Sequence, residues 1–389
     1  MTYRLNEYGQ MIADRVRMDP YAYALKAAIG PDSVVLDIGA GTGIHALLAC
    51  KFGARHVYAI EPNEAIHLAR ELAQANGYGD RITFIHDFST QVTLPERADV
   101  IVSDLRGVLP LFGAHIPAVV DARQRHLAPG GRLIPKRDNL WVALVEAGSV
   151  YKELLKPWDH PYGLAMEEAR QIVLNSWTAD HTQEFRPGNL LMAPHQWAVL
   201  DYESIVDPDV TGMNSMHWAT RSGTAHGLLI WFDAELFEGF GFSNGPQEKR
   251  TAEVYGQGFF PLLAPVALEE GDSIDLTVRA ELVQGEYIWR WFTRIQGQDE
   301  AAVVKADFKQ STAGDTPLSR NRLAEQAKNS RPALSEEGQI DLFIMGKMDG
   351  QATMAEIARD TFSQFPTRFK DQGEALIHVY GVAQQDKEG

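Results

Sequence analysis

The stretch "VVLDIGAGTGIHALLACKFGARHVYAIE" constrains the fold more than any other part of the chain. Its first apolar run is typical of a buried parallel strand, and the glycines after it permit a tight turn next to a ligand. The residues that follow have helical apolar spacing, and "HVYAI" then predicts a second strand ending at Glu61. This order predicts a βαβ unit that binds a nucleotide-like cofactor, with Glu61 accepting hydrogen bonds from ribose hydroxyls.

The glycine turn favours one cofactor over another. Asp37 precedes three alternating glycines, which are Gly39, Gly41 and Gly43. A pyrophosphate gains nothing from a carboxylate at that place. S-adenosylmethionine has no phosphate and carries an α-ammonium and a sulfonium, so the acidic turn favours it over NAD.

The following residues continue the alternation of strands and helices. Residues 81–104 predict two more strands, of which the first ends at Asp87 and the second at Asp104. Asp87, Phe88 and Ser89 lie at a strand end, where they would flank an adenine ring. We therefore expect an α/β, Rossmann-like cofactor domain over residues 1–139.

A different pattern begins at about Leu140. Short apolar and aromatic runs, such as "QWAVLDY" and "EYIWRWFTRI", alternate with turn residues rich in glycine, proline and asparagine. Runs of this kind predict an antiparallel sandwich or barrel. We assign residues 140–305 to this second domain.

Several motifs together resemble the protein arginine methyltransferases, a branch of the class I S-adenosylmethionine-dependent methyltransferases. The resemblance covers residues 8–300 and rests on "MIADRVRMDPY", "VLDIGAGTG", "HLAPGGRLIP" and "WFDAELFEGFGFSNGP". It implies that Arg17 pairs with the cofactor carboxylate and that S-adenosylhomocysteine is the product. It also implies a β-barrel domain and a homodimer formed through a helical arm near residues 151–170. The alternative for the arm is a loop that packs on its own subunit.

The resemblance fails where the family binds its substrate. The family holds the acceptor guanidinium with two glutamates, and here the two positions are Asp104 and Gly113. The family's Thr-His-Trp motif is also missing, with Val254 and Tyr255 at the matching place. These departures favour methyl transfer to a nitrogen or oxygen of a peptide or small metabolite. The alternatives are arginine methylation with a remodelled grip, or a cofactor-binding scaffold without activity.

The loop after the fourth predicted strand supplies three candidate catalytic residues. Asp104 would orient the acceptor, or else cap the next segment or touch the cofactor. His115 would take a proton near neutral pH, or else be a structural histidine. Arg106 would bind a substrate carboxylate or phosphate, or else form a surface ion pair. Tyr8 is a further candidate for the pocket wall.

The last third predicts an added module. Residues 306–330 are polar and rich in turn formers, as in a linker. Residues 331–389 predict three helices, with a capping box from Thr353 to Glu356. This module weakly resembles winged-helix domains that bind peptides, and the alternative is a structural extension that packs on the barrel.

The charge distribution bears on possible partners. The formal net charge is −16, and residues 151–300 hold 10 Lys+Arg against 23 Asp+Glu, a balance of −13. Such a field repels nucleic acid and attracts basic ligands, although a solvated acidic surface is the alternative. No apolar run suggests a membrane span or secretion signal, and histidine spacing suggests no metal site. With Cys50 as the only cysteine, these features predict a cytoplasmic protein.

Overall fold

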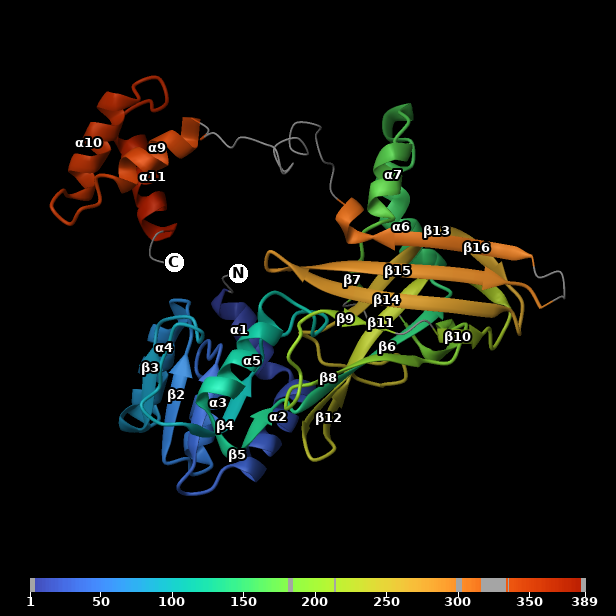
Figure 1. Cartoon of the computed structure of the whole chain (residues 1–389), viewed down its shortest axis with the longest axis horizontal. Coiled ribbons are helices and arrows are strands. Elements are labelled where there is room, and N and C mark those ends of the chain that lie inside the picture. Colours follow the sequence, from blue (N-terminus) through green and yellow to red (C-terminus); the bar gives the residue numbers. More distant parts are fainter. Residues whose placement is uncertain are drawn as a thin grey trace. The chain divides into compact units, whose positions relative to one another are not determined.

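The computed structural model describes residues 4–180, 185–212, 215–298, 303–315, 334 and 336–385. The chain divides into two compact units, Met1–Pro317 and Leu318–Gly389. The larger unit holds one parallel and two antiparallel sheets, and the smaller one is helical where it is described (Figure 1). None of the described helices has both the length and the apolar character that a bilayer span requires.

The parallel sheet forms the cofactor domain. Its strands are β1 (Val34–Ile38), β2 (His56–Ile60), β3 (Ile82–Ile85), β4 (Ala98–Ser103) and β5 (Leu127–Ile134). They lie in the order β3-β2-β1-β4-β5, with every neighbouring pair parallel. The chain leaves β1 toward one edge and later returns to its other side, so the strand order reverses between β1 and β4. Ligands of open α/β sheets bind outside the carboxyl ends of the strands at such a reversal.

Helices cover this sheet, and the one after the glycine turn begins at Ile44, as the sequence pattern predicts. They are α1 (Leu5–Ala13), α2 (Arg15–Ala28), α3 (Ile44–Lys51), α4 (Ala65–Ala75) and α5 (His115–His126), with a short η1 (Gly79–Arg81). α3 packs on β1 and β2, α4 on β3, and α5 on β4 and β5. The predicted Rossmann-like architecture is confirmed. β3 ends two residues before the predicted Asp87, whose carboxylate accepts the backbone N–H of Phe88 at 2.7 Å.

Two antiparallel sheets form the second domain. One contains β6 (Arg137–Val145), β7 (Thr178–Asp180), β8 (His195–Asp201), β11 (Gly223–Phe237), β12 (Phe240–Ser243) and β13 (Gln257–Leu268). The other contains β9 (Val210–Thr211), β10 (Ser215–Trp218), β14 (Ser273–Val283), β15 (Glu286–Gln296) and β16 (Val304–Ser311). Buried Trp231, Trp289 and Trp291 fill the core, and the indole N–H of Trp291 donates to the Pro261 carbonyl of the opposite sheet at 3.3 Å. The predicted antiparallel β domain is therefore confirmed.

Helix α2 joins the cofactor domain to the barrel. It packs on β11 and β12, and its N-cap residue Asp14 accepts the backbone N–H of Arg17 at 3.3 Å. The other carboxylate oxygen of Asp14 accepts the backbone N–H of Glu253 at 2.7 Å. This contact places the segment before β13, including Tyr255, next to the loop that follows β4.

The region predicted as an arm is helical. It contains α6 (Gly148–Leu155), η2 (Lys156–Trp158), η3 (Pro161–Gly163) and α7 (Glu167–Val173), and α7 projects beyond the strands of the barrel (Figure 1). Tyr162 is fully exposed and Leu164 is 55% exposed. Within the described residues these two apolar side chains stay mostly uncovered, whereas a loop packed on its own subunit would bury them.

The predicted start of the linker at residue 306 is wrong. β16 continues to Ser311 and is followed by η5 (Thr312–Gly314), because residues as far as 311 pair with β15, for example Phe308 with Thr293. A further short turn, η4 (Pro187–Asn189), precedes β8. The rest of the predicted linker falls largely on 316–333, which lie outside the described residues.

The smaller unit contains the three predicted helices, α9 (Glu336–Met345), α10 (Met354–Gln364) and α11 (Gln372–Gln385). Ile340, Ile344, Ile357 and Val379 form its core. The predicted capping box is confirmed, because Thr353 Oγ1 accepts the Glu356 N–H at 3.3 Å and Glu356 accepts the Thr353 N–H at 2.9 Å. Residues 336–385 include no strand, so they show helices without the wing of a winged-helix domain.

Candidate active site

A cavity of about 370 Å³ lies at the carboxyl ends of β1 and β4. Residues from the turn after β1, the loop after β4, and helices α1 and α2 line it. Nine of the predicted site residues belong to its wall: Arg17, Gly39, Gly41, Glu61, Phe88, Ser89, Asp104, Arg106 and His115. Tyr8, the further candidate for the pocket wall, lines the same cavity. The cavity is therefore where the sheet reversal predicts a ligand.

The glycine turn is tightly covered on two sides. Gly39 and Gly41 have φ angles of 70° and 53°, in the region that favours glycine. A Cβ at Gly41 would lie 2.6 Å from the ring of Tyr8, and one at Gly39 would lie 2.5 Å from Leu105. Only glycine lets α1 and the loop after β4 come this close to the turn. Gly43 (φ 83°) stands at the N-cap of α3 and lies outside the cavity wall.

Glu61 holds the turn in place from the end of β2. Its side chain is buried, and Oε2 accepts the Gly41 N–H at 2.8 Å. Oε1 accepts the backbone N–H of Asn63 at 3.0 Å and its side-chain amide at 2.6 Å. A carboxylate that fixes the turn and also faces the cavity has the acceptor chemistry that ribose hydroxyls need.

Asp37 lies directly behind the turn, outside the wall of the cavity. It is fully buried, and Oδ2 accepts the Ala46 N–H at 3.0 Å. Oδ1 has no hydrogen-bond partner in the described chain, and His45 Nδ1 lies 3.9 Å from it. Burial raises the pKa of Asp37 to about 7. A buried acceptor without a donor behind a glycine cradle fits a ligand that carries positive charge, as S-adenosylmethionine does.

Arg17 and Asp104 form a buried ion pair at the wall of the cavity. Arg17 Nε donates to Asp104 Oδ2 at 2.5 Å, and Arg17 Nη1 donates to the Met11 carbonyl at 3.0 Å. Burial by itself would lower the pKa of Arg17, but the charge of Asp104 outweighs burial and raises that pKa above its ordinary value. Burial alone would raise the pKa of Asp104, but Arg17 and Arg106 hold it below its usual range. Among the described residues, no hydrogen bond engages Arg17 Nη2, so it can serve a cofactor carboxylate.

Arg106 is an interior residue, and the predicted alternative of a surface ion pair is wrong. Its side chain is 0% exposed. Nε lies 3.2 Å from Asp104 Oδ1, and Nη1 donates to Asp138 Oδ1 at 2.9 Å. Nη2 donates to the hydroxyl of Tyr21 and, at 3.4 Å, to that of Tyr255. The guanidinium therefore has partners at every nitrogen.

Three residues of this site were missed by the sequence analysis, and a fourth was noted only as a replacement. Asp138 in β6, Tyr21 in α2 and Tyr202 after β8 carry no local signal for function. Tyr255 stands where the Thr-His-Trp motif is lost, and its hydroxyl donates to both oxygens of Asp104 at 2.5 Å. The sequence signal for Tyr255 was its place at the position of the family's Thr-His-Trp motif.

His115 begins α5 and is buried at the cavity wall. The Tyr202 hydroxyl donates to Asp138 Oδ2 at 2.7 Å, so its oxygen accepts from His115 Nε2 at 2.9 Å. This network assigns the proton to Nε2 and leaves Nδ1 with an unpaired, buried lone pair. Burial, reinforced by Arg106, lowers the pKa of His115 to about 3. The imidazole is therefore neutral at physiological pH and does not titrate near 6.5.

The residues after β3 divide between the cavity and the surface. Phe88, which is 50% exposed, and buried Ser89 line the cavity. Asp87 is exposed and lies outside the cavity wall, and its carboxylate accepts the backbone N–H of Phe88. Gly113 also lines the cavity, and a Cβ built there would meet no atom within 4 Å. The place of the family's second glutamate is therefore open.

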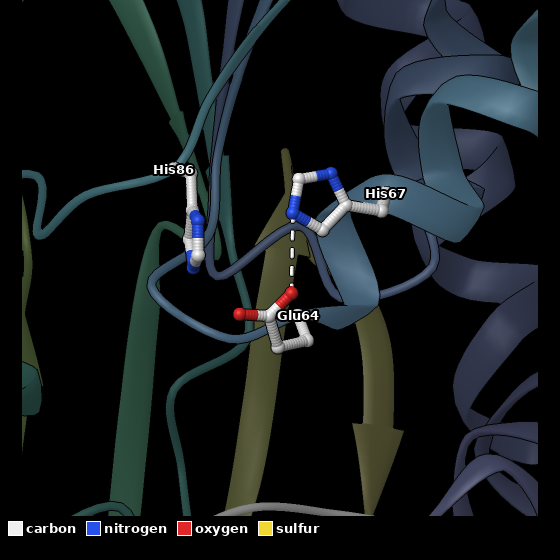
Figure 2. Close-up of side chains that lie close together, drawn as sticks. All are labelled: Glu64, His67 and His86. Carbon is white, nitrogen blue, oxygen red and sulfur yellow. Dashed lines mark ion pairs between the residues drawn. The ribbon is translucent and has the colours of Figure 1, made fainter. Parts of the chain in front are cut away.

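One group of possible metal ligands lies outside the cavity wall. Glu64, His67 and His86 each offer a ligand atom, and these atoms lie within 4.8 Å of one another (Figure 2). All three residues are exposed, Glu64 and His67 pair at 3.2 Å, and His86 Nε2 is bonded to the Pro62 carbonyl at 2.8 Å. An exposed i,i+3 pair beside a histidine already bonded to backbone is ordinary surface chemistry, and we assign it no role.

Comparison with known families agrees with the two domains. Residues 35–131 match the family model described as a methyltransferase domain. Residues 136–286 match the model described as an arginine methyltransferase oligomerization subdomain.

Individual relatives point in the same direction. The chain is 29% identical over 289 residues to protein arginine N-methyltransferase 1 of Schizosaccharomyces pombe, covering 72% of this chain and 83% of that one. It is 29% identical to the Chlamydomonas reinhardtii protein of the same name, over 63% of this chain and 72% of that one. Among solved structures, Arabidopsis thaliana protein arginine methyltransferase 10 superposes with a TM-score of 0.69 at 22% identity, covering 79% and 97% of the two chains. The Trypanosoma brucei PRMT1 enzyme-prozyme complex with AdoHcy gives 0.71 at 20% identity, covering 79% and 98%.

The fold, the cofactor cavity and these matches define a class I S-adenosylmethionine-dependent methyltransferase. S-adenosylmethionine is its cofactor and S-adenosylhomocysteine its product. Within that class the chain is similar to the protein arginine methyltransferases, and the predicted resemblance is confirmed. It differs from that pattern at Asp104, Gly113 and Tyr255.

Replacing Glu61 tests the cofactor side of the cavity. Glu61→Ala removes the acceptor of the Gly41 N–H and the expected partner of the ribose. We expect binding of S-adenosylhomocysteine to weaken by roughly 1–3 kcal/mol in calorimetry, the cost of leaving polar partners unpaired. Glu64→Ala, three residues along and exposed, is the matched control and should change the affinity little. Equal affinities for wild type and Glu61→Ala would remove Glu61 from the ribose site.

A second prediction concerns the pH dependence of stability. An unfolded histidine takes up a proton below pH 6.5, whereas native His115 does so only near 3, so protons favour the unfolded chain between these values. Wild type should therefore lose stability relative to His115→Gln as pH falls, by roughly 2 kcal/mol between pH 8 and pH 5. Denaturant unfolding at both pH values measures the difference, with His160→Gln, an exposed site, as control. A pH-independent difference would mean that native His115 does protonate.

Proposed function

We propose that the chain methylates arginine side chains of protein acceptors, through a grip rebuilt around Asp104. The relatives supply the acceptor class, because both are named protein arginine N-methyltransferases. One observation on this chain carries the proposal: two carboxylates and several aromatic rings already surround a guanidinium beside the cofactor cavity. Arginine methylation with a remodelled grip, an alternative in the sequence analysis, therefore replaces a small metabolite as the leading acceptor.

The residues of the cavity divide the work of binding. Glu61 serves the ribose hydroxyls and Arg17 serves the carboxylate of the cofactor. Phe88 and Ser89 flank the adenine. The bound cofactor supplies an electrophilic methyl carbon on a sulfonium, and the chain positions a nucleophilic nitrogen in line with it.

Proton removal is the remaining requirement on the acceptor side. A guanidinium nitrogen must lose a proton as the methyl group is gained. His115 Nδ1 is unprotonated and lacks a donor in the described chain, so it can accept a hydrogen bond from the acceptor nitrogen. Because the pKa of His115 is about 3, the imidazole does not keep the proton, which passes to solvent water as the N–CH3 bond forms and the bond from the methyl carbon to sulfur breaks. Asp104 orients the acceptor while its charge stays shared with Arg17.

A second candidate is a nitrogen or oxygen that carries no positive charge, on a peptide or small metabolite. The hydrogen bonds of Asp104 favour it, since Arg17, Arg106 and Tyr255 occupy both of its oxygens. Gly113 leaves the second carboxylate position open. A neutral acceptor needs neither carboxylate.

Paired peptides separate the two candidates. We expect a glycine-flanked arginine peptide to accept label from radiolabelled S-adenosylmethionine and to yield methylarginine in mass spectrometry. The same peptide with lysine should stay unlabelled, because an ammonium lacks the planar fork that a carboxylate grips. Glu61→Ala, which weakens binding of the cofactor, is the control that shows whether labelling depends on the enzyme. Label on hydroxyl or amine acceptors with none on arginine would replace the first candidate by the second.

The proposed assembly is a homodimer formed through residues 151–170, working in the cytoplasm as the sequence predicts. Support comes from the oligomerization subdomain match and from the exposed apolar side chains of the arm. A peptide acceptor, without nucleic acid, fits the acidic middle third of the chain.

Two aspartates on the arm test the dimer. Tyr162→Asp with Leu164→Asp places charge on a surface that a partner would bury, and aspartate tolerates the positive φ of residue 162. We expect light scattering to show a dimer for wild type and a monomer for the double variant. Val206→Asp, 69% exposed and outside the arm, should remain dimeric. A wild-type monomer, or a dimeric double variant, would refute this arrangement.

A further inference from the structure

The surroundings of Arg106 are those of a guanidinium-binding site. Two carboxylates, Asp104 and Asp138, approach Nε and Nη1 at 3.2 and 2.9 Å. Two hydroxyls, from Tyr21 and Tyr255, accept from Nη2. Paired carboxylates around a planar fork are the chemistry by which proteins bind arginine side chains.

Aromatic rings complete the enclosure. The guanidinium carbon lies between 5.3 and 5.8 Å from the ring centres of Tyr21, Phe232, Phe242 and Tyr255. Phe232 and Phe242 belong to β11 and β12, so the barrel supplies one side of the enclosure. Cation–π attraction is strongest where the cation is desolvated, as it is here.

This enclosure adjoins the cofactor cavity. Asp104, Leu105 and Arg106 belong to the cavity wall, as do Gly39 and Glu61 of the cradle. Asp104 also binds Arg17, which faces the same cavity. A guanidinium in the place of Arg106 would therefore lie beside the methyl-transfer site.

We infer that Arg106 determines acceptor specificity by occupying the guanidinium subsite of this enzyme, so that an acceptor arginine binds there only by displacing it. The exchange replaces one guanidinium by another, which keeps both carboxylates neutralised. This inference rests on the proposed function, which supplies the assumption that an acceptor arginine enters through the cofactor cavity.

The competing explanation is a purely structural ion cluster. Arg106 joins the loop after β4 to Asp138 in β6, and buried pairs of this kind can hold two elements together without any ligand. Such a cluster would accept a small guanidinium in a truncated variant. It would not admit a peptide, because it would have no opening toward the cavity.

Rescue of a truncated side chain distinguishes the two explanations. Arg106→Ala in the full chain, with S-adenosylhomocysteine present, should melt at a lower temperature than wild type, because buried Asp138 loses its charged partner and Asp104 keeps only Arg17. Methylguanidine and the tripeptide Gly-Arg-Gly should each raise that melting temperature, since both bind the native state. Methylamine, which lacks the fork, should not, and neither guanidinium compound should shift wild type.

Arg81→Ala is the matched control variant. Arg81 is half-buried and, like Arg106, lies beside a tyrosine, but it donates to the carbonyls of Cys50 and Ala54 and contacts no carboxylate among the described residues. Its melting temperature should not respond to methylguanidine. Rescue of both variants would mean non-specific stabilisation and would refute the inference.

A charge-balanced variant covers the case in which Arg106→Ala does not fold. Arg106→Ala with Asp138→Asn removes both charges of the buried pair, leaves the enclosure empty and keeps Asp104. In calorimetry, we expect Gly-Arg-Gly to bind this variant at least about tenfold more tightly than wild type. Equal binding by the two proteins would overturn the inference, as would rescue of Arg106→Ala by methylguanidine without any effect of the tripeptide.

The binding readout keeps the inference separate from the proposed function. Both experiments use the product cofactor, so no methyl transfer occurs. If the variants bind the tripeptide but no form of the enzyme makes methylarginine, the proposed function fails and the specificity role of Arg106 stands. If wild type methylates arginine and binds the tripeptide as tightly as the variants, the inference fails and the function stands.

Discussion

Two arginines and two aspartates meet in the interior of the larger unit, and the geometry of the active site depends on their mutual neutralisation. Arg17, Arg106, Asp104 and Asp138 are all buried, and each has an oppositely charged partner within 3.2 Å. An unpaired charge in such a place costs several kcal/mol, so removing any one of the four alone would leave a buried charge without a partner and destabilise the folded chain. Tyrosine hydroxyls bond Nη2 of Arg106 and Oδ2 of Asp138.

This cluster links the two sides of the cavity. Asp104 is shared, because one oxygen serves Arg17 on the cofactor side and the other serves Arg106 on the acceptor side. Replacing either arginine therefore changes the electrostatic interaction of the other with Asp104. Because Asp138 belongs to β6 and Tyr255 precedes β13, the barrel contributes directly to the site rather than only supporting it.

The chain keeps residues that the resemblance assigns to the cofactor and differs in those that it assigns to the acceptor. The glycine turn, Glu61 and Arg17 take the positions that the resemblance implies, in a fold shared with arginine methyltransferases. The loop after β4 differs in the residues that face the acceptor. Since fold alone does not specify a substrate, the acceptor of this enzyme depends on these few side chains.

The sequence by itself determined the cofactor domain, the antiparallel domain, the three terminal helices and the cradle from Asp37 to Glu61. These features are local, because hydrophobic period, glycine turns and caps each act within a few residues. Only the tertiary structure decided what Arg106 does. Its partners Asp138, Tyr21 and Tyr255 lie 32, 85 and 149 residues away, and no local pattern marks them. The same holds for the pKa of His115, since burial by distant segments, rather than its place in the loop, keeps the imidazole neutral.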